Sequence, residues 1–143
     1  MKLTEHFTLE QMIFSQTAVR KGIDNTPTAE QITNLQNLCT NILEPLQASL
    51  GVIVLSSGFR CVTLNKAIGG ASNSQHCQGM AADINIKGLN VEQVFQFIKH
   101  STLPFDQVIQ EFGSWVHVSF SPRNRRECLR ATTTNGKTVY SVA

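Results

Sequence analysis

The stretch of sequence that decides the fold and the site is SQHCQGMAADINI, residues 74–86. It places an imidazole, His76, and a carboxylate, Asp83, on either side of Gly79, and a turn at this glycine lets both side chains point at one site. Residues 81–86 alternate in polarity as a strand does, with Asp83 on the more polar face. The stretch therefore predicts a turn that leads into a strand.

A second strand is predicted at residues 115–120, where the alternation turns His117 away from the buried valines. If this strand pairs antiparallel with residues 81–86, His117 becomes a neighbour of Asp83, and His76 completes a set of three. Two histidines and one carboxylate with an open fourth position form a catalytic zinc arrangement. Because a lone histidine is more often a hydrogen-bonded structural residue, spacing alone leaves both interpretations open.

Helices are predicted in the N-terminal half of the chain. Thr8 has the position of an N-cap for a short helix at residues 9–15, and the sequence from Thr28 to Gln31 fits a capping box that opens a long helix. The apolar residues of the long helix recur at helical spacing: Ile32, Leu35, Leu38, Cys39, Ile42, Leu43 and Leu46. We expect Pro45 to kink it and Gly51 to end it.

The rest of the chain predicts a small sheet and one more helix. Residues 58–78 are rich in Gly, Ser and Asn and are expected to be irregular, with the helix at about 91–100. The other predicted strands are residues 52–56, 108–111, 127–132 and 137–142. The last two flank Asn135-Gly136, a strong hairpin signal. This order predicts an α+β fold with a small antiparallel sheet packed against helices.

Composition limits the class of protein. With 143 residues and 41% hydrophobic content, the chain suits a single domain over residues 1–143. The net charge of +2 argues against nucleic acid as a partner, and the arginines near residues 123–126 are expected in a solvated loop. No segment has the roughly 20 apolar residues that span a bilayer, and the start has no signal-peptide pattern. The four cysteines form no CxxC pair and are expected to be free.

The pattern Ser-x-His-x-x-Gly-x-Ala-x-Asp, residues 74–83, resembles that of the zinc D-alanyl-D-alanine carboxypeptidase and L-alanyl-D-glutamate endopeptidase family. Further elements match in order: SSGFR at 56–60, the loop at 65–70 and Trp-Val-His at 115–117. The N-terminal stretches at 6–11 and 23–27 are similar to the short, single-domain phage-type branch, whereas the hairpin after Pro122 carries no matching motif. The resemblance implies a hedgehog/DD-peptidase-like fold and Zn²⁺ held by His76, Asp83 and His117.

One residue departs from the family pattern. Many members carry the catalytic acid three residues before the last histidine, and here that residue is Ser114. Glu111 instead resembles the spacing of the hedgehog branch, so it is our candidate for the general base. A carboxylate near the zinc water would indicate an active enzyme, whereas its absence would indicate a zinc-containing wall-binding module that has lost turnover.

The resemblance also implies residues that contact substrate. Arg60 can pair with a substrate carboxylate or steady an oxyanion, although it can equally be a surface or core-capping arginine. Ser74 and Gln75 are expected to hydrogen-bond the peptide backbone of the substrate, or else to cap their loop. Trp115 is expected to line the pocket, or else to serve packing. Gly69 and Gly70 are assigned to loop geometry.

The resulting expectation is a monomeric zinc metallopeptidase that hydrolyses peptide bonds of peptidoglycan stem peptides. It is made in the cytoplasm without a signal peptide and acts at the bacterial cell wall, in phage or prophage lysis through a holin or on a phage tail. No nucleic-acid partner and no membrane insertion are expected. The motifs do not distinguish a carboxypeptidase from an endopeptidase, and a zinc-free structural protein would require the matched ligand set to be a coincidence.

Overall fold

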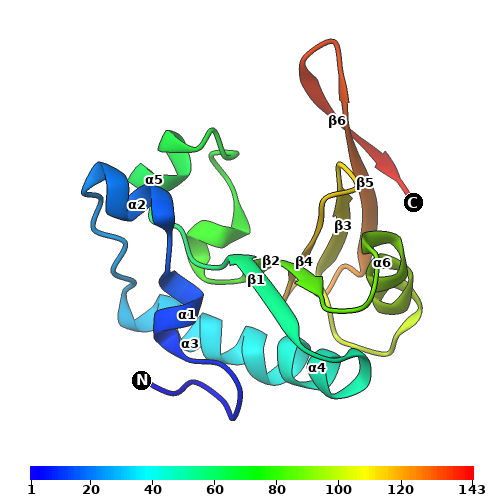
Figure 1. Ribbon diagram of the computed structural model, residues 1–143, viewed down its shortest axis with the longest axis horizontal. Helices are drawn as coiled ribbons and strands as arrows, with labels where there is room; N and C mark the ends of the chain where they lie inside the picture. The colour runs from blue at the N-terminus through cyan, green and yellow to red at the C-terminus, as the bar shows by residue number, and fades with distance from the viewer.

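A six-stranded sheet organises the chain, in the spatial order β1-β2-β4-β3-β5-β6 (Figure 1). The computed structural model describes all residues from Met1 to Ala143. The strands are β1 Ile53–Ser57, β2 Ala81–Ile86, β3 Gln107–Glu111, β4 Trp115–Ser119, β5 Glu127–Thr134 and β6 Lys137–Val142. The α+β class is as predicted, and β2 has the predicted bounds.

One pair of strands differs from the expected antiparallel sheet, since β3 and β5 run parallel. Strand β4 already pairs with β2 on one side and with β3 on the other. Strand β4 ends at Ser119, which pairs with Gln107 at the start of β3, so the loop at 120–126 carries the chain only across to the far side of β3. Strand β5 starts there beside β3, so the two share one direction.

The helices agree with the predicted segments except for three short additions, α2, α5 and η2. The helical elements are α1 Leu9–Ile13, α2 Gln16–Lys21, α3 Ala29–Leu38, η1 Cys39–Leu43, α4 Glu44–Leu50, α5 Val62–Ala67, η2 Gln75–Gln78 and α6 Val91–His100. The first predicted helix ends at Ile13 because Ser15 caps the new helix α2 by accepting from the backbone N–H of Ala18. Helix α5 and the 3₁₀ turn η2 lie in the segment that was expected to be irregular.

A helical run from Ala29 to Leu50 forms one continuous support beneath the sheet (Figure 1). Thr28 opens it with the predicted capping box, in which its hydroxyl accepts from Gln31 N–H and the Gln31 side chain accepts from Thr28 N–H. Because Pro45 has no N–H and its ring crowds the preceding turn, the run passes through a π-helical turn, η1, just before it.

One face of the sheet packs against the helices, and the other carries the candidate site. On the helix-covered face, Val108, Val116, Val118 and Ile84 join the apolar side chains of α3, η1, α4 and α6 in one buried core. The opposite face carries the polar candidates of β2 and β4. None of the helices combines the length and the apolarity needed to cross a membrane. All four cysteines are free, as predicted.

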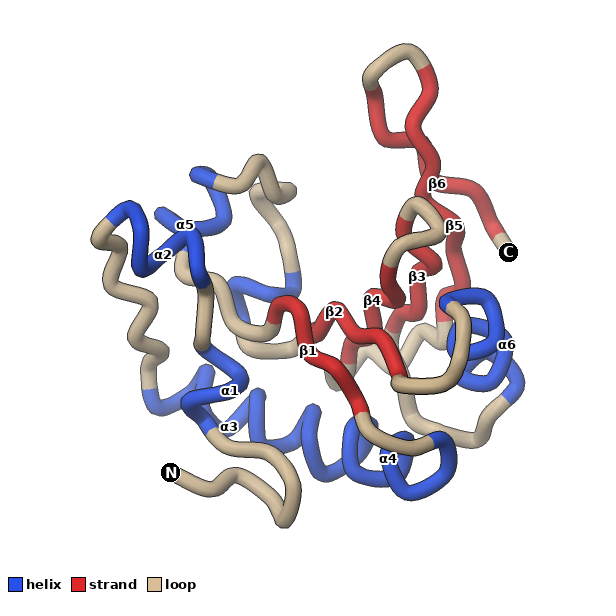
Figure 2. Tube along the Cα trace, in the orientation of Figure 1, coloured by secondary structure: helices blue, strands red, loops and turns tan.

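The β5–β6 hairpin projects beyond the rest of the molecule (Figure 2). Its turn is formed by Asn135 and Gly136, both at positive φ (52° and 75°), as the hairpin signal predicted. The loop before β5 is exposed at residues 122–126, as expected for a solvated arginine loop, and two of its arginines also have partners within the protein. Arg125 pairs with the fully buried Asp106 at 2.8 Å, and Arg126 stacks over the Phe105 ring at 4.4 Å, so these two cations hold the start of β5 in place.

Candidate metal centre

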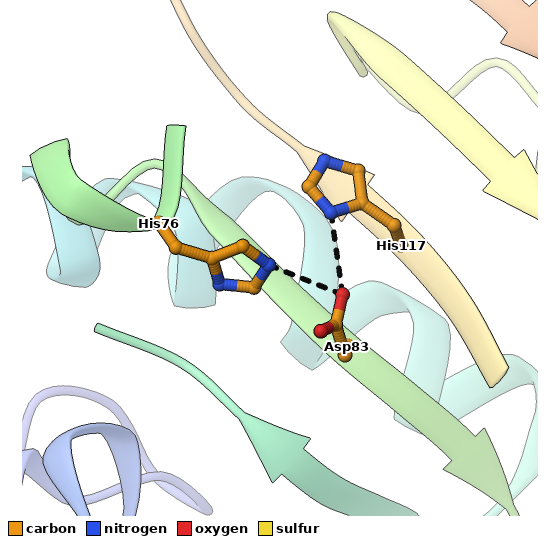
Figure 3. Close-up of side chains that lie close together, drawn as sticks. All are labelled: His76, Asp83 and His117. Atoms are coloured by element: carbon orange, nitrogen blue, oxygen red, sulfur yellow. Dashed lines mark hydrogen bonds and ion pairs between the residues drawn. The ribbon is translucent and has the colours of Figure 1, made fainter. Parts of the chain in front are cut away.

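Two imidazole rings converge on one carboxylate oxygen of Asp83 (Figure 3). Asp83 on β2 is the direct antiparallel partner of His117 on β4. Asp83 Oδ1 lies 3.1 Å from His76 Nε2 and 3.2 Å from His117 Nδ1. All three residues are buried, and their potential ligand atoms lie within 4.8 Å of one another. The structure therefore brings together the three residues expected as metal ligands.

The turn η2 holds His76 against the helical support. Ser74 caps this turn by accepting from His76 N–H, and Gly79 ends it at φ 76°. A Cβ on Gly79 would lie 2.6 Å from the backbone oxygen of Gln31 in α3, which is closer than two atoms can approach. Only glycine thus allows both the left-handed backbone and the close packing that place His76 at the entrance of β2.

The His76 ring has a fixed tautomer. Its Nδ1 lies 2.7 Å from the Gly58 carbonyl oxygen, which only accepts, so Nδ1 carries the proton and donates. In the neutral ring, Nε2 then presents a lone pair towards Asp83. Burial lowers the pKa of His76 and favours this neutral form.

The electrostatics at Asp83 provide a test of whether these residues fit a metal ion. Burial raises the pKa of Asp83, but attraction to the protonated forms of the two histidine rings outweighs it and holds the pKa well below its usual range, so the carboxylate is ionised when a cation lies beside it. Without such a cation, the neutral His76 ring directs its Nε2 lone pair at Asp83 Oδ1, and two acceptors face each other at 3.1 Å. Either a proton or a metal ion must lie between them, and burial disfavours the protonated ring. The donor set fits a divalent metal ion.

Glu111 lies beside this cluster at the end of β3. Its Oε1 accepts from Trp115 Nε1 at 3.1 Å and lies 3.8 Å from His117 Nδ1. Burial raises the pKa of Glu111, and the negative charge of Asp83 adds to this against the opposing effect of His117. Ser114 is exposed in the β3–β4 turn, and its hydroxyl donates to the Phe112 carbonyl oxygen. A carboxylate is thus close to the cluster, and it is Glu111.

The cluster forms part of the lining of a cleft of about 510 Å³. One wall is the segment from Ile68 to Gln75, and the other comes from β3, β5 and β6. The lining includes every expected site residue: Arg60, Ser74, Gln75, His76, Asp83, Glu111, Trp115 and His117. The structure therefore gathers all of them around one cavity.

Arg60 and Ser74 form a pair at the wall of the cleft. Arg60 Nη2 donates to Ser74 Oγ over 3.4 Å, and Arg60 Nε is buried with no hydrogen-bond partner. No carboxylate lies within ion-pair distance of Arg60. Ser74 serves its loop, as one of the two expectations held, because it also caps η2. The guanidinium is left as an uncompensated cation next to the cavity.

Gln75 and Trp115 have partners inside the protein. Gln75 Nε2 donates to Asp106 Oδ2 at 2.9 Å, so the Arg125–Asp106 pair also steadies this wall of the cleft. Trp115 both lines the cavity and donates to Glu111, so it positions the candidate base as well as packing.

The sequence interpretation missed three contributions to the site. Gly58 supplies the carbonyl that orients His76, and no side-chain pattern could indicate a backbone acceptor. Leu129 and Tyr140 of the hairpin line the cleft. Alternation along residues 137–142 does predict that Thr138 and Tyr140 share a face, but only the β3–β5 pairing decides that this face is the one with the site.

Comparison with known protein families identifies the family of this chain. The model of the family described as peptidase M15 matches residues 5–119, which include every residue of the cluster and Glu111 and leave out the β5–β6 hairpin. No curated protein matches the sequence.

Proposed function

Since the chain belongs to the peptidase M15 family, a family of metallopeptidases, we propose that it is a zinc-dependent peptidase that hydrolyses peptide bonds of peptidoglycan stem peptides. One observation carries this proposal: two buried imidazoles contact a buried carboxylate at 3.1 and 3.2 Å in the lining of a cleft of about 510 Å³. A purely structural cluster would have no need of the adjoining cavity.

The donor set favours zinc. His76 Nε2, His117 Nδ1 and Asp83 Oδ1 offer two nitrogens and one oxygen, which is a ligand set of catalytic zinc sites. The same set also suits Fe(II) in oxygenases, and membership of a peptidase family favours zinc over iron. When bound, zinc supplies Lewis acidity, which lowers the pKa of a water molecule and polarises the scissile carbonyl.

Glu111 is the proposed general base. Its carboxylate takes a proton from the attacking water and returns it to the leaving amine, and a raised pKa brings it closer to the pH at which both transfers are efficient. The Trp115 indole N–H holds Oε1 in position, which leaves Oε2 for the water. The presence of this carboxylate favours the enzyme over a wall-binding module without turnover.

Arg60 supports the choice of a stem peptide as substrate. Stem peptides carry free carboxylates, and Arg60 offers a guanidinium at the cleft with no acidic partner of its own. A planar guanidinium binds a carboxylate through two parallel hydrogen bonds, or steadies an oxyanion through one. Ser74 and Gln75 lie next to it on the same wall and are proposed to contact the substrate backbone.

The biological setting that we propose is phage or prophage lysis, or wall penetration by a tail, with a monomer acting at the bacterial cell wall. The resemblance of residues 6–11 and 23–27 to the short phage-type branch supports it.

Digestion of purified peptidoglycan tests the proposal directly. We expect the protein with added zinc to release fragments whose masses identify the cleaved bond as D-Ala–D-Ala or L-Ala–D-Glu. The Glu111→Gln variant and a chelator-treated sample are the matched controls, and both are expected to release almost nothing. Equal release by wild type and both controls, or no release by any of them, would contradict the proposal.

A further inference from the structure

The C-terminal hairpin lies outside the segment that the family model matches, yet it forms part of the cleft. The match ends at residue 119, and β5 begins at Glu127. Three hairpin residues, Leu129, Thr138 and Tyr140, line the same cavity as the metal cluster. The hairpin therefore contributes to the site from outside the matched segment.

The strand register aligns Tyr140 with the candidate base. Tyr140 pairs with Ala131, Ala131 pairs with Glu111, and Glu111 pairs with Trp115. Side chains of directly paired residues point to the same face of a sheet. Tyr140, Glu111 and Trp115 thus form one row, and the small, fully buried Ala131 leaves room between the tyrosine and the glutamate.

An aromatic group gathers at this end of the cleft. Phe112 stacks edge-on against Trp115 with ring centroids 5.7 Å apart, and both line the cavity together with Tyr140. Phe112 is held at φ 58°, a backbone conformation that a bulky residue adopts only at a cost, and it is 40% exposed. Tyr140 is 53% exposed. Two large rings are thus left uncovered beside the proposed catalytic centre.

The charges of the cleft restrict what this aromatic end can bind. The cations of the lining are Arg60, Arg123 and Arg125, and none of them belongs to the β3–β4 turn or to β6. The only carboxylate of the row is Glu111, and its Oε1 is already engaged by Trp115. An uncharged aliphatic group fits such a surface, because it buries apolar area without leaving a charge unpaired.

We propose that Tyr140, Phe112 and Trp115 form an aromatic subsite that positions an aliphatic side chain of the peptide substrate beside Glu111. This inference rests on the proposed function and specifies it further, since it makes the hairpin a determinant of specificity. Tyr140 acts through the substrate and takes no part in proton transfer.

Steady-state kinetics on the synthetic stem pentapeptide L-Ala-D-γ-Glu-L-Lys-D-Ala-D-Ala test the subsite. Tyr140→Ala is expected to raise KM about tenfold, the usual effect of a lost apolar contact in a pocket, with kcat changed less than about twofold. Tyr140→Phe keeps the ring and is expected to restore the wild-type KM. Val139→Ala is the matched control, because Val139 is also exposed on β6 but faces the other side of the sheet.

A binding measurement separates failure of the subsite from failure of the proposed function. Trp115 is the only tryptophan of the chain, so its fluorescence reports on a ligand that enters the subsite. We expect the pentapeptide to change this emission in Glu111→Gln and to bind more weakly when Tyr140→Ala is added. Turnover with the same KM in wild type and Tyr140→Ala would contradict the proposed subsite but would remain consistent with peptidase activity. Binding that depends on Tyr140 without any turnover would retain the subsite and reject the peptidase.

Discussion

Replacement of Glu111 by glutamine separates metal binding from catalysis. Glutamine has nearly the same shape, and its Oε1 can still accept from Trp115 Nε1, which lies 3.1 Å away in the wild type. The Glu111 side chain is 15% exposed, so the variant loses a charge that burial already disfavours, and we expect its fold to be retained. The glutamine amide cannot take a proton from water. A positioned proton carrier is worth about 10²–10⁴-fold in rate, or roughly 3–5 kcal/mol of activation free energy.

The assay measures zinc content, the thermal unfolding midpoint and muropeptide release on one preparation of Glu111→Gln. We expect unchanged zinc, an unfolding midpoint close to that of the wild type, and release reduced by about 10²–10⁴-fold. Glu30→Gln is a suitable control, since it removes an exposed carboxylate from the first turn of α3, outside the lining of the cleft. Undiminished release with intact zinc would refute the assignment of the base.

Substitutions at three further positions, Arg60, Gly79 and Asp106, test the residues around the metal cluster. Arg60→Lys and Arg60→Ala should lower kcat/KM about 10- to 100-fold, because a point charge cannot replace a two-pronged hydrogen bond to a charged group; wild-type kinetics in the alanine variant would make this arginine structural. Gly79→Ala should lower the free energy of unfolding by about 1–3 kcal/mol because of its positive φ alone, and by more because its Cβ would lie 2.6 Å from a backbone oxygen. Gly88 has a φ of 85° and open space around it, so Gly88→Ala is the control that should show only the effect of φ in denaturant unfolding. Asp106→Asn should destabilise the protein by about 3 kcal/mol at pH 7, because it leaves a cation without its buried partner. Burial raises the pKa of Asp106, but the Arg125 partner outweighs burial and holds this pKa below its usual range. The stability difference between Asp106→Asn and the wild type should therefore be full above the unfolded-state pKa of about 3.9 and should shrink as the pH falls below that value. An Asp106→Asn difference that is the same at pH 3 and pH 7 would contradict this account.

Local patterns predicted the parts of the fold that depend on local interactions. The N-cap at Thr8 and the capping box at Thr28 form as expected, and Thr8 also forms a box with Gln11, because each motif needs only a side chain and the next three residues. Helix α6 has the predicted bounds for the same reason, with Asn90 as its cap. The alternation of the two strands predicted that Asp83 and His117 would be neighbours if the strands paired antiparallel, and β2 and β4 do pair in this way.

The parts that were missed depend on contacts between distant segments. Helix α5 has only six residues, from Val62 to Ala67, so it lacks a periodic pattern long enough to detect. The parallel pairing of β3 with β5 follows from which edge of the sheet is free, which no single strand encodes. For the same reason Tyr140 could be assigned to a strand but not to the site. The ion pair between Arg125 and Asp106 was missed because the two residues are 19 positions apart in the sequence.

The central claim is that His76, Asp83 and His117 hold one zinc ion, and elemental analysis of the purified protein tests it most directly. We expect one zinc per chain in the wild type and in Glu111→Gln, with the metal weakened in each single alanine variant of the three ligands. The His76→Ala/His117→Ala double variant should contain almost none, because only one of the three donors remains. Stoichiometric zinc in that double variant would contradict the assignment of the metal site.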